Sequence, residues 1–325
     1  MRLRALLLLA SALAADAPAP APPLDVEPHE RLLVVAPHPD DETLGGGGLI
    51  QRVLARDGSV RVVLLTLGDG YVEAVRHETG ELRPPPTAYR AYGERRLREA
   101  RDAMRVLGGG RIRLGVLGFP DGGLGPLLDA HWSRTNPERS ATTGATRPPY
   151  PEALDRTAAY DGDDLRRELV HVLRETQPTL VAFAHPLDRH PDHRPTGLFT
   201  LLALRDWTNE GAALPRLLAY LVHWPGWPPG WDAAGAPSAG APRQPLDLPA
   251  SLSPPGLARA TLELSQREVA TKAAALRRYA TQQEVMPALL AAFIRSTEPF
   301  ALFTAEEVRD VAQLIDRPSG AIPRR

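Results

Sequence analysis

The sequence contains no cysteine and only one lysine, Lys272, among its 325 residues. Without cysteine there can be no disulfide, no catalytic thiol, no metal held by thiolates and no lipid anchor attached through sulfur. An excess of charge of one sign is also missing, because the net charge is −1. This balance gives no attraction toward nucleic acid or an anionic membrane, so neither is an expected partner. Because disulfides are excluded, the fold must be stabilised by its own apolar core.

Long apolar runs are missing after the N-terminus. The first residues, MRLRALLLLASALAADAPAP, combine a short basic start, an apolar stretch from Ala5 to Leu13 and a small-x-small site around Leu13. This arrangement predicts a secretory signal peptide over 1–14 and fits an amphipathic helix of the fold less well. A proline-rich leader, 15–28, follows, and no later segment is apolar for long enough to cross a bilayer. We therefore expect a secreted or periplasmic protein with no integral membrane segment after signal cleavage.

Short apolar segments alternate with amphipathic ones along the rest of the chain, which we expect to form one domain over 29–325. Buried β-strands are predicted at 31–36, 60–67, 111–118, 179–184 and 216–222. Helical periodicity is found at 47–58, 88–108, 163–176, 197–207, 265–282 and 287–296. The alternation predicts an α/β, Rossmann-like fold: a mostly parallel sheet with helices on both faces, closed by C-terminal helices. Residues 224–258, rich in proline, glycine and alanine, are expected to form an irregular excursion over the surface.

Four consecutive glycines, 45–48, follow the first expected strand and resemble a dinucleotide-binding loop. The spacing G-x-G-x-x-G fails, however, because position 50 is isoleucine. The glycines are better explained by close packing of a helix against its neighbours. They also leave backbone N–H groups at the start of that helix able to face an anion.

Two clusters of histidines and acidic residues come directly after two of the expected strands. The first is VVAPHPDDET, residues 34–43, and the second is HPLDRHPDHRPTG, residues 185–197. Three acidic side chains placed so close together repel one another unless they are solvated or share a cation. Because ligands of parallel sheets bind at the carboxyl ends of the strands, we expect the two clusters to form one site.

Histidine and carboxylate ligands in this pattern indicate a catalytic zinc ion, which commonly takes three protein ligands and keeps a fourth position for water. His38 and Asp41 lie three residues apart on a turn stiffened by Pro39, and a third ligand would come from the second cluster. A cation there would offset the repulsion between the acidic side chains. It would also lower the pKa of bound water from about 15.7 toward 7. Asp40, beside a ligand, is placed to act as a general base. Glu42 is expected either to hold a ligand histidine or to cap the following helix.

The motifs APHPDDE and HPDH, in this order and separation, resemble the PIG-L/LmbE family of zinc-dependent N-deacetylases. Members remove acetyl groups from N-acetylglucosamine moieties of small glycosides, glycolipids or glycans. The resemblance extends from about Arg31 to Trp207, with weaker similarity in KAAALRRYATQQ and FIRSTEPF. It implies Zn²⁺ as cofactor, His38, Asp41 and His193 as its ligands, and an acetylated amino sugar as substrate.

The resemblance also implies a mechanism of amide hydrolysis. Zinc would bind water and the acetamide oxygen, and Asp40 would take the proton of the water as it attacks the carbonyl. His190 would help stabilise or protonate the developing charge, with Asp192 as its orienting partner.

The family pattern further implies a substrate pocket lined by an Arg-x-x-Glu pair and by an Asp-Gly-like turn. In this chain these correspond to Arg96 with Glu99 and to Asp121, and Arg96 could also bind a phosphate or carboxylate.

Some members polarise the carbonyl with a tyrosine shortly before HPDH, but the corresponding segment here contains Phe183 and no tyrosine. His185 is a candidate for this role, although His185 and Asp188 are equally well explained as structural loop residues.

Two other classes of protein compete with the deacetylase. A histidine and carboxylate set also describes non-haem Fe(II) oxygenases, which would make the protein an oxidoreductase. Such sites usually lie on a β-barrel with a His-x-Asp pair, whereas here the spacing is His-x-x-Asp and the elements alternate. A catalytically silent glycan-binding protein would be expected to lose the base or a ligand, and none is lost.

Overall fold

The computed structural model describes residues 21–229, 244–252 and 258–315. The predicted signal peptide, 1–14, and the first residues of the proline-rich leader lie outside this part of the chain. Within it, one sheet has seven strands in the order β3-β2-β1-β4-β5-β7-β6. The strands are β1 (Arg31–Ala36), β2 (Ser59–Leu64), β3 (Ile112–Val116), β4 (Leu180–Ala184), β5 (Arg216–Tyr220), β6 (Arg259–Glu263) and β7 (Thr297–Phe303). Strands β1 to β5 are parallel, and β7 runs antiparallel to both of its neighbours.

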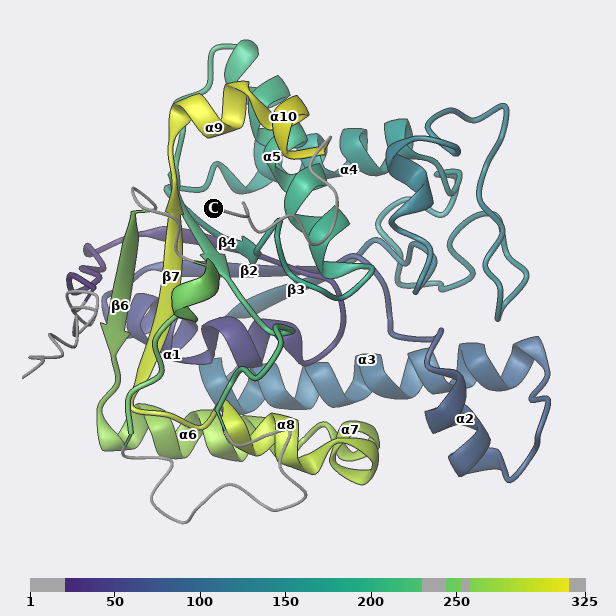
Figure 1. Cartoon of the computed structure of the whole chain (residues 1–325), viewed down its shortest axis with the longest axis horizontal. Coiled ribbons are helices and arrows are strands. Elements are labelled where there is room, and N and C mark those ends of the chain that lie inside the picture. Colours follow the sequence, from purple (N-terminus) through teal and green to yellow (C-terminus); the bar gives the residue numbers. More distant parts are fainter. Residues whose placement is uncertain (1–20, 230–243, 253–257, 316–325) are drawn as a thin grey trace, which may run out of the picture.

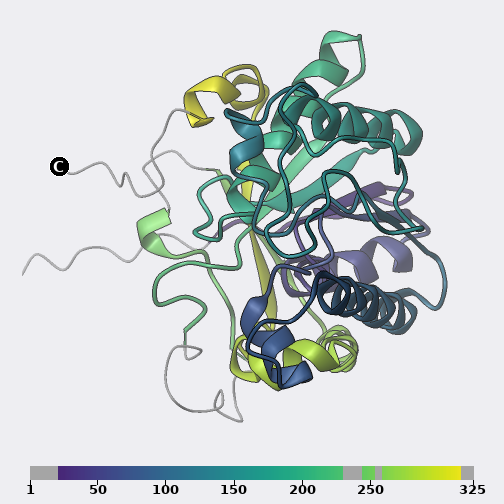
Figure 2. The ribbon, with the colours of Figure 1, turned by 90° about the vertical axis from the view of Figure 1, so that its right-hand side faces the viewer.

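Helices cover both faces of this sheet (Figure 1). They are α1 (Asp41–Ala55), α2 (Val72–Thr79), α3 (Pro86–Gly108), α4 (Gly162–Thr176), α5 (His193–Asn209), α6 (Gln266–Leu276), α7 (Ala280–Val285), α8 (Pro287–Ala292), α9 (Ala305–Arg309) and α10 (Val311–Ile315). Helices α1, α3 and α6 lie below the sheet in Figures 1 and 2, and α4 and α5 lie above it. The Rossmann-like α/β architecture predicted from the alternating pattern is therefore confirmed. No helix of the described residues is long and apolar enough to span a bilayer.

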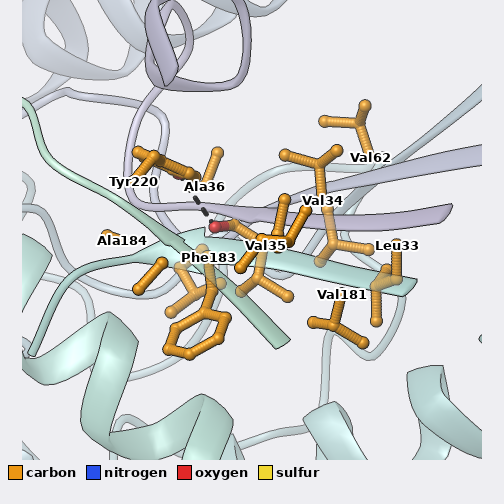
Figure 3. Packing of buried hydrophobic residues seen from close by; sticks show 14 of the residues in the cluster. Leu33, Val34, Val35, Ala36, Val62, Val181, Phe183, Ala184 and Tyr220 are labelled. Carbon is orange, nitrogen blue, oxygen red and sulfur yellow. Dashed lines mark hydrogen bonds between the residues drawn. The ribbon is translucent and has the colours of Figure 1, made fainter. Parts of the chain in front are cut away.

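The central strand β1 lies between β2 and β4, and its side chains are buried from Leu32 onward. Figure 3 shows Val34, Val35 and Phe183 packed among the aliphatic side chains of the neighbouring strands. The Tyr220 hydroxyl donates a 3.0 Å hydrogen bond to the carbonyl of Val35 and so joins β5 to β1 across β4. Continuous apolar burial of this kind explains why these strands were recognisable as uninterrupted hydrophobic runs.

The direction of the chain across the sheet reverses between β1 and β4. After β1 the chain continues outward to β2 and β3, and after β4 it continues the other way to β5. The loops that leave adjacent parallel strands on either side of such a switch point diverge and leave a crevice, where open α/β sheets bind their ligands. The first cluster follows β1 and the second follows β4, so both clusters lie at this crevice.

Several elements differ from the sequence-based expectations at the C-terminal side. Strands β6 and β7 were not predicted: β6 has only five residues, and β7 contains Pro299, which weakens a strand pattern. The helix expected over 265–282 is interrupted, and α6 and α7 are separate. The helix expected over 287–296 ends at Ala292, where α8 stops. Helix α1 begins earlier than expected, at Asp41, so the glycine run lies inside it.

The glycines of α1 allow close packing, as expected, and form no phosphate loop. A side-chain carbon at Gly45 would lie 2.3 Å from the Tyr220 ring, and one at Gly48 would lie 2.3 Å from Leu264. Any larger residue would therefore push α1 away from β5 or from the loop before α6.

The single lysine of the chain forms a buried ion pair next to these glycines. Lys272 Nζ donates to Glu298 Oε1 at 2.7 Å and to the carbonyl of Leu44 at 2.8 Å. The same carboxylate accepts from the backbone N–H groups of Gly48 and Leu49. Lys272 is only 1% exposed, so α6 and β7 are joined to the middle of α1 by charges that water does not reach.

The described parts of 224–258 are irregular except for a 3-10 turn at Ala250–Leu252. They do not simply run over the surface, since Trp224 and Trp227 are buried. The indole of Trp227 donates to the carbonyl of Asp247, which fastens one end of this excursion to the other.

Candidate metal centre

The two motifs meet at the crevice because each is held at the end of one of two paired strands. His38 lies in the turn between β1 and α1, and His193 is the first residue of α5, which follows β4. Their ring centroids are 5.2 Å apart, and both side chains are buried. The prediction that the two clusters form one site is confirmed by this geometry.

Asp41 lies between the two histidines. Its Oδ2 atom is 3.1 Å from His38 Nδ1 and 3.2 Å from His193 Nε2. His193 Nε2 is buried and has no hydrogen-bond partner, which is costly for a polar atom unless something else binds it. Two imidazole nitrogens and one carboxylate oxygen facing one point fit the ligand set of a catalytic zinc ion. These three residues are the ones that the sequence motifs imply as ligands.

Carboxylates stand behind both histidines. Asp188 Oδ2 lies 3.3 Å from His193 Nδ1, on the side of the ring that faces away from Asp41. Asp121 Oδ1 lies 2.9 Å and Asp192 Oδ2 3.2 Å from His38 Nε2. Carboxylates in these positions hold the ligand rings in one orientation and fix the tautomer that offers the other nitrogen to a metal.

The charges of this cluster are strongly coupled. Burial alone would lower the pKa of His38 and His193, but the adjacent carboxylates raise both, that of His193 to about 9. Burial would raise the pKa of Asp41, yet the two histidines hold it well below its usual range. These shifts favour protonated rings in the absence of a cation, and a cation bound beside Asp41 would replace those protons.

Other sets of side chains at the crevice are also close enough to share an ion. One is His38 with His190 and His193, and the other is His38 with Asp121 and Asp192. The two carboxylates of the second set are already occupied by backbone N–H groups. His38 is common to both sets, so the cation position adjoins His38 in every arrangement.

Asp40, the expected general base, is held in a strained backbone conformation with φ of 130°. Non-glycine residues rarely adopt positive φ, and such strain is often retained where it places a functional group. Its Oδ2 atom lies 3.3 Å from Arg96 Nη2. Burial raises the pKa of Asp40, with a smaller lowering from Arg96. A cation beside Asp41 would lower this pKa further and favour the carboxylate form that a base requires.

Arg96 lines the pocket, as the resemblance implies, but its guanidinium is largely committed to the protein. It donates to the carbonyls of Pro39 and Gly68 and is only 4% exposed. The expectation that Arg96 binds a phosphate or carboxylate of the substrate is therefore not supported, and the carboxylate that it contacts is that of the base Asp40.

Two acidic residues expected near the site hold the structure around it. Glu42 accepts from the backbone N–H of Asp40 at 3.0 Å and from the Tyr279 hydroxyl, so it supports the turn and touches no histidine. Glu99 accepts from the N–H and hydroxyl of Thr281 and fixes the start of α7. The expectation that Glu99 lines the pocket is wrong, because its carboxylate faces the helix behind it.

The expected pairing of Asp192 with His190 is also wrong. The Asp192 carboxylate accepts from the backbone N–H groups of Gly122 and Leu124 and faces His38. His190 Nδ1 instead accepts from the backbone N–H of Asp192, which leaves Nε2 as the position of its proton. Burial and the neighbouring histidines lower the pKa of His190, which disfavours the imidazolium form that it would need to protonate the developing charge.

His185 does not reach the pocket. Its Nδ1 accepts from the N–H of Leu187, and its ring packs against Phe303 at 5.6 Å. Burial lowers its pKa to about 4. The suggestion that His185 replaces the carbonyl-polarising tyrosine is therefore wrong in its geometry, and the alternative of a structural loop residue is the one the structure favours.

A cavity of about 390 Å³ opens above the histidines. Sequence reasoning placed Asp121 and Arg96 in it correctly. Its remaining lining includes residues that this reasoning missed, namely His223, Tyr71, Glu73, Gln282, Met286 and Leu289. His223 carried a usable signal, because it follows an apolar strand in the same way as the two recognised clusters. The others lie on α2, α7 and α8 or beside them, where no motif marks them.

An open parallel sheet with histidines and carboxylates converging in its switch-point crevice is the arrangement of a metal-dependent hydrolase. Residues 33–204 match the family described as PIG-L: GlcNAc-PI de-N-acetylase. The chain belongs to the PIG-L family and is an enzyme, a metal-dependent amide hydrolase.

Comparison with individual proteins agrees with this family. A 1D-myo-inositol 2-acetamido-2-deoxy-α-D-glucopyranoside deacetylase of Kineococcus radiotolerans is 32% identical over 269 residues, which cover 78% of this chain and 68% of that protein. A protein of the same name from Tsukamurella paurometabola is 31% identical over 276 residues, covering 79% and 84%. The structure of N,N′-diacetylchitobiose deacetylase from Pyrococcus horikoshii shares the fold with a TM-score of 0.50 and 18% identity, covering 86% of this chain and 85% of that one.

Proposed function

We propose that the protein is a zinc-dependent deacetylase that hydrolyses the N-acetyl group of an N-acetylglucosamine-type sugar, glycoside or glycan. The observation that carries this proposal is Asp41 Oδ2, which stands within 3.2 Å of ring nitrogens of both His38 and His193 and directly beside the buried acid Asp40. Two relatives that act on an N-acetylglucosamine derivative, by their names, support the substrate class.

Zinc held by His38, Asp41 and His193 would supply a Lewis acid and a water of lowered pKa. Asp40 would accept the proton of that water, and Arg96 keeps its carboxylate in place through the 3.3 Å contact. His190 offers Nε2–H toward the reacting groups, because its Nδ1 is engaged by the main chain. These roles need no movement of the backbone, since each side chain is already fixed by its partners.

The lining of the cavity suits a pyranose ring. Glu73 offers carboxylate oxygens to sugar hydroxyls, while Tyr71, Met286 and Leu289 present apolar surface. A sugar has a hydroxyl-bearing edge and apolar C–H faces, so both kinds of lining would be used. The acidic side of the cavity does not favour an anionic substrate group near the metal.

The N-terminal pattern of residues 1–14 supports export, and we include a secreted or periplasmic location in the proposal. Substrates would then be glycans or glycosides outside the cytoplasm.

The proposal is tested by measuring acetate release from a panel of N-acetylated monosaccharides, glycosides and oligomers with the zinc-loaded protein. Release of stoichiometric acetate and free amine from at least one N-acetylglucosaminide is expected. Binding of these sugars without acetate release would instead support a silent glycan-binding protein, and product formation that required Fe(II) and oxygen would support the oxygenase alternative.

A further inference from the structure

We infer that His223 is a further catalytic residue, which donates a hydrogen bond to the carbonyl oxygen of the scissile acetamide. The inference rests on the proposed hydrolysis. Attack on an amide carbonyl turns its oxygen into an oxyanion, and a donor placed in advance for that charge commonly accelerates the reaction 10²–10³-fold.

His223 is placed at the reacting centre by the end of β5. Its ring centroid lies 4.7 Å from that of His193 and 5.0 Å from that of His190, and it lines the cavity. The ring nitrogens of His223 make no hydrogen bond to any described residue, whereas those of the other histidines at the centre face carboxylates or backbone groups. An imidazole with an uncommitted N–H at the wall of a substrate cavity is available for a ligand.

The position of His223 is rigid. Its backbone N–H donates to Asp188 Oδ2 at 3.0 Å, and the N–H of Val222 donates to the same atom at 2.9 Å. This carboxylate also faces His193 Nδ1 at 3.3 Å. Asp188 therefore holds His223 at a fixed distance from the proposed metal ligand His193. A preorganised hydrogen-bond donor needs such a fixed position.

Other donors near the centre are less suitable. The hydroxyls of Tyr220 and Tyr279 are bonded to the protein, at Val35 and Glu42 respectively. His185 lies behind the site. Tyr71 and His190 also line the cavity, and they are the competing candidates that an experiment must separate from His223.

His223 assists the attack of water on the acetamide carbonyl. The water oxygen forms a bond to the acetamide carbon while Asp40 accepts a proton from it, and the π electron pair of the carbonyl moves onto its oxygen. His223 stabilises that oxygen through N–H and transfers no proton. Collapse of the intermediate re-forms the carbonyl and breaks the C–N bond, while the leaving nitrogen takes up the proton that Asp40 accepted, so that acetate and the free amine are released.

The test compares His223→Leu, which lacks a donor, with His223→Gln, which retains an amide N–H. The measurements are zinc content per chain, kcat and KM for an N-acetylglucosaminide, and the affinity of a phosphonamidate in which tetrahedral phosphorus replaces the acetamide carbon. We expect both variants to keep one zinc per chain. In His223→Leu, kcat should fall roughly 10²–10³-fold with KM changed by less than about threefold, and the phosphonamidate should bind weaker by a similar factor. His223→Gln should recover part of both losses.

The control is His171→Leu, a change of an exposed histidine on α4 that should behave as wild type. Unchanged kcat and phosphonamidate affinity in His223→Leu would overturn the inference while leaving the proposed function intact. A loss of kcat in Tyr71→Phe or His190→Leu, with none in His223→Leu, would assign the donor to that other residue and also overturn the inference. If wild-type protein released no acetate, the proposed function would fail, and equal phosphonamidate affinity of wild type and His223→Leu would then reject His223 separately.

Discussion

His193 Nδ1 lies 3.3 Å from Asp188 Oδ2, and both side chains are fully buried. Burial raises the pKa of Asp188, but the opposing effect of His193 holds it far below its usual range, so the group is a carboxylate. Neither ring nitrogen of His193 has a hydrogen-bond partner among the described residues, but a carboxylate beside Nδ1 favours the proton there and leaves Nε2 for a metal.

Removal of this carboxylate should weaken the metal site. We expect Asp188→Ala to lower zinc affinity about 10–100-fold, because the ring of His193 loses both its orientation and its fixed tautomer. Competition with a chelator measures the affinity directly. Asp102→Ala, on the exposed side of α3, is the matched control and should leave it unchanged. Wild-type affinity in Asp188→Ala would show that Asp188 does not support the ligand.

Substitutions of the two adjacent aspartates should distinguish the general base from the metal ligand. Asp40→Asn keeps the shape of the side chain but cannot accept a proton, so zinc should remain bound while kcat falls by roughly 10² or more. Asp41→Asn should lose zinc. Metal analysis beside steady-state kinetics distinguishes these results, and the reverse pattern would mean that the two roles are exchanged.

The buried ion pair of Lys272 should matter more for stability than any surface pair. Lys272→Met leaves the Glu298 charge buried without its partner, so the free energy of unfolding should fall by about 3–5 kcal/mol. Lys272→Met with Glu298→Gln should recover part of this loss, because the amide oxygen can still accept from the backbone of α1. Denaturant unfolding gives both values.

The comparison for this prediction is the exposed pair of Arg105 and Asp102 on α3. Arg105→Met should change the free energy of unfolding by less than about 1 kcal/mol. Similar losses in Lys272→Met and Arg105→Met would contradict the importance assigned to burial.

Much of the fold was predictable because strands buried on both faces form continuous apolar runs, as in β1 and β4. β6 escaped prediction because it has only five residues, and β7 because it contains Pro299. The pairing of β7 with β5 also joins segments that are far apart along the chain. The break between α6 and α7 also depends on residues far along the chain, because Tyr279 and Thr281 at the break form hydrogen bonds with side chains of α1 and α3.

The site was predictable to the level of residue type and motif, but not of individual contacts. His38, Asp41 and His193 follow from two local motifs and meet as expected. The partner of Asp192 could not be deduced, because the N–H groups that bind it belong to a turn about 70 residues away. Distances between such segments are set by packing of the sheet and leave no local pattern.

A pH dependence of stability is expected from Glu168 on α4, away from the metal centre. Burial, with a smaller contribution from Asp155, raises its pKa from 4.5 to about 8, and its Oε1 atom is buried without a hydrogen bond. The folded protein therefore retains a proton that the unfolded chain has lost. The stabilising contribution of that proton is complete below pH 4.5 and is lost as the pH rises to about 8.

Glu168→Gln mimics the protonated side chain at every pH. Relative to wild type, the variant should have a similar free energy of unfolding near pH 4.5 and a higher one near pH 9, by on the order of 2 kcal/mol. Denaturant unfolding at several pH values measures the difference. A difference between the two proteins that did not change with pH would show that Glu168 does not titrate in this range.

The most direct test of the metal-dependent deacetylation is a titration of metal-free protein with Zn²⁺ while acetate release from an N-acetylglucosaminide is followed. We predict no acetate release without metal, a linear increase with added zinc and saturation at one zinc per chain, with neither activity nor stoichiometric binding in His38→Ala or His193→Ala. Full activity in the metal-free protein, or one zinc per chain in the variant that combines His38→Ala with His193→Ala, would contradict the account.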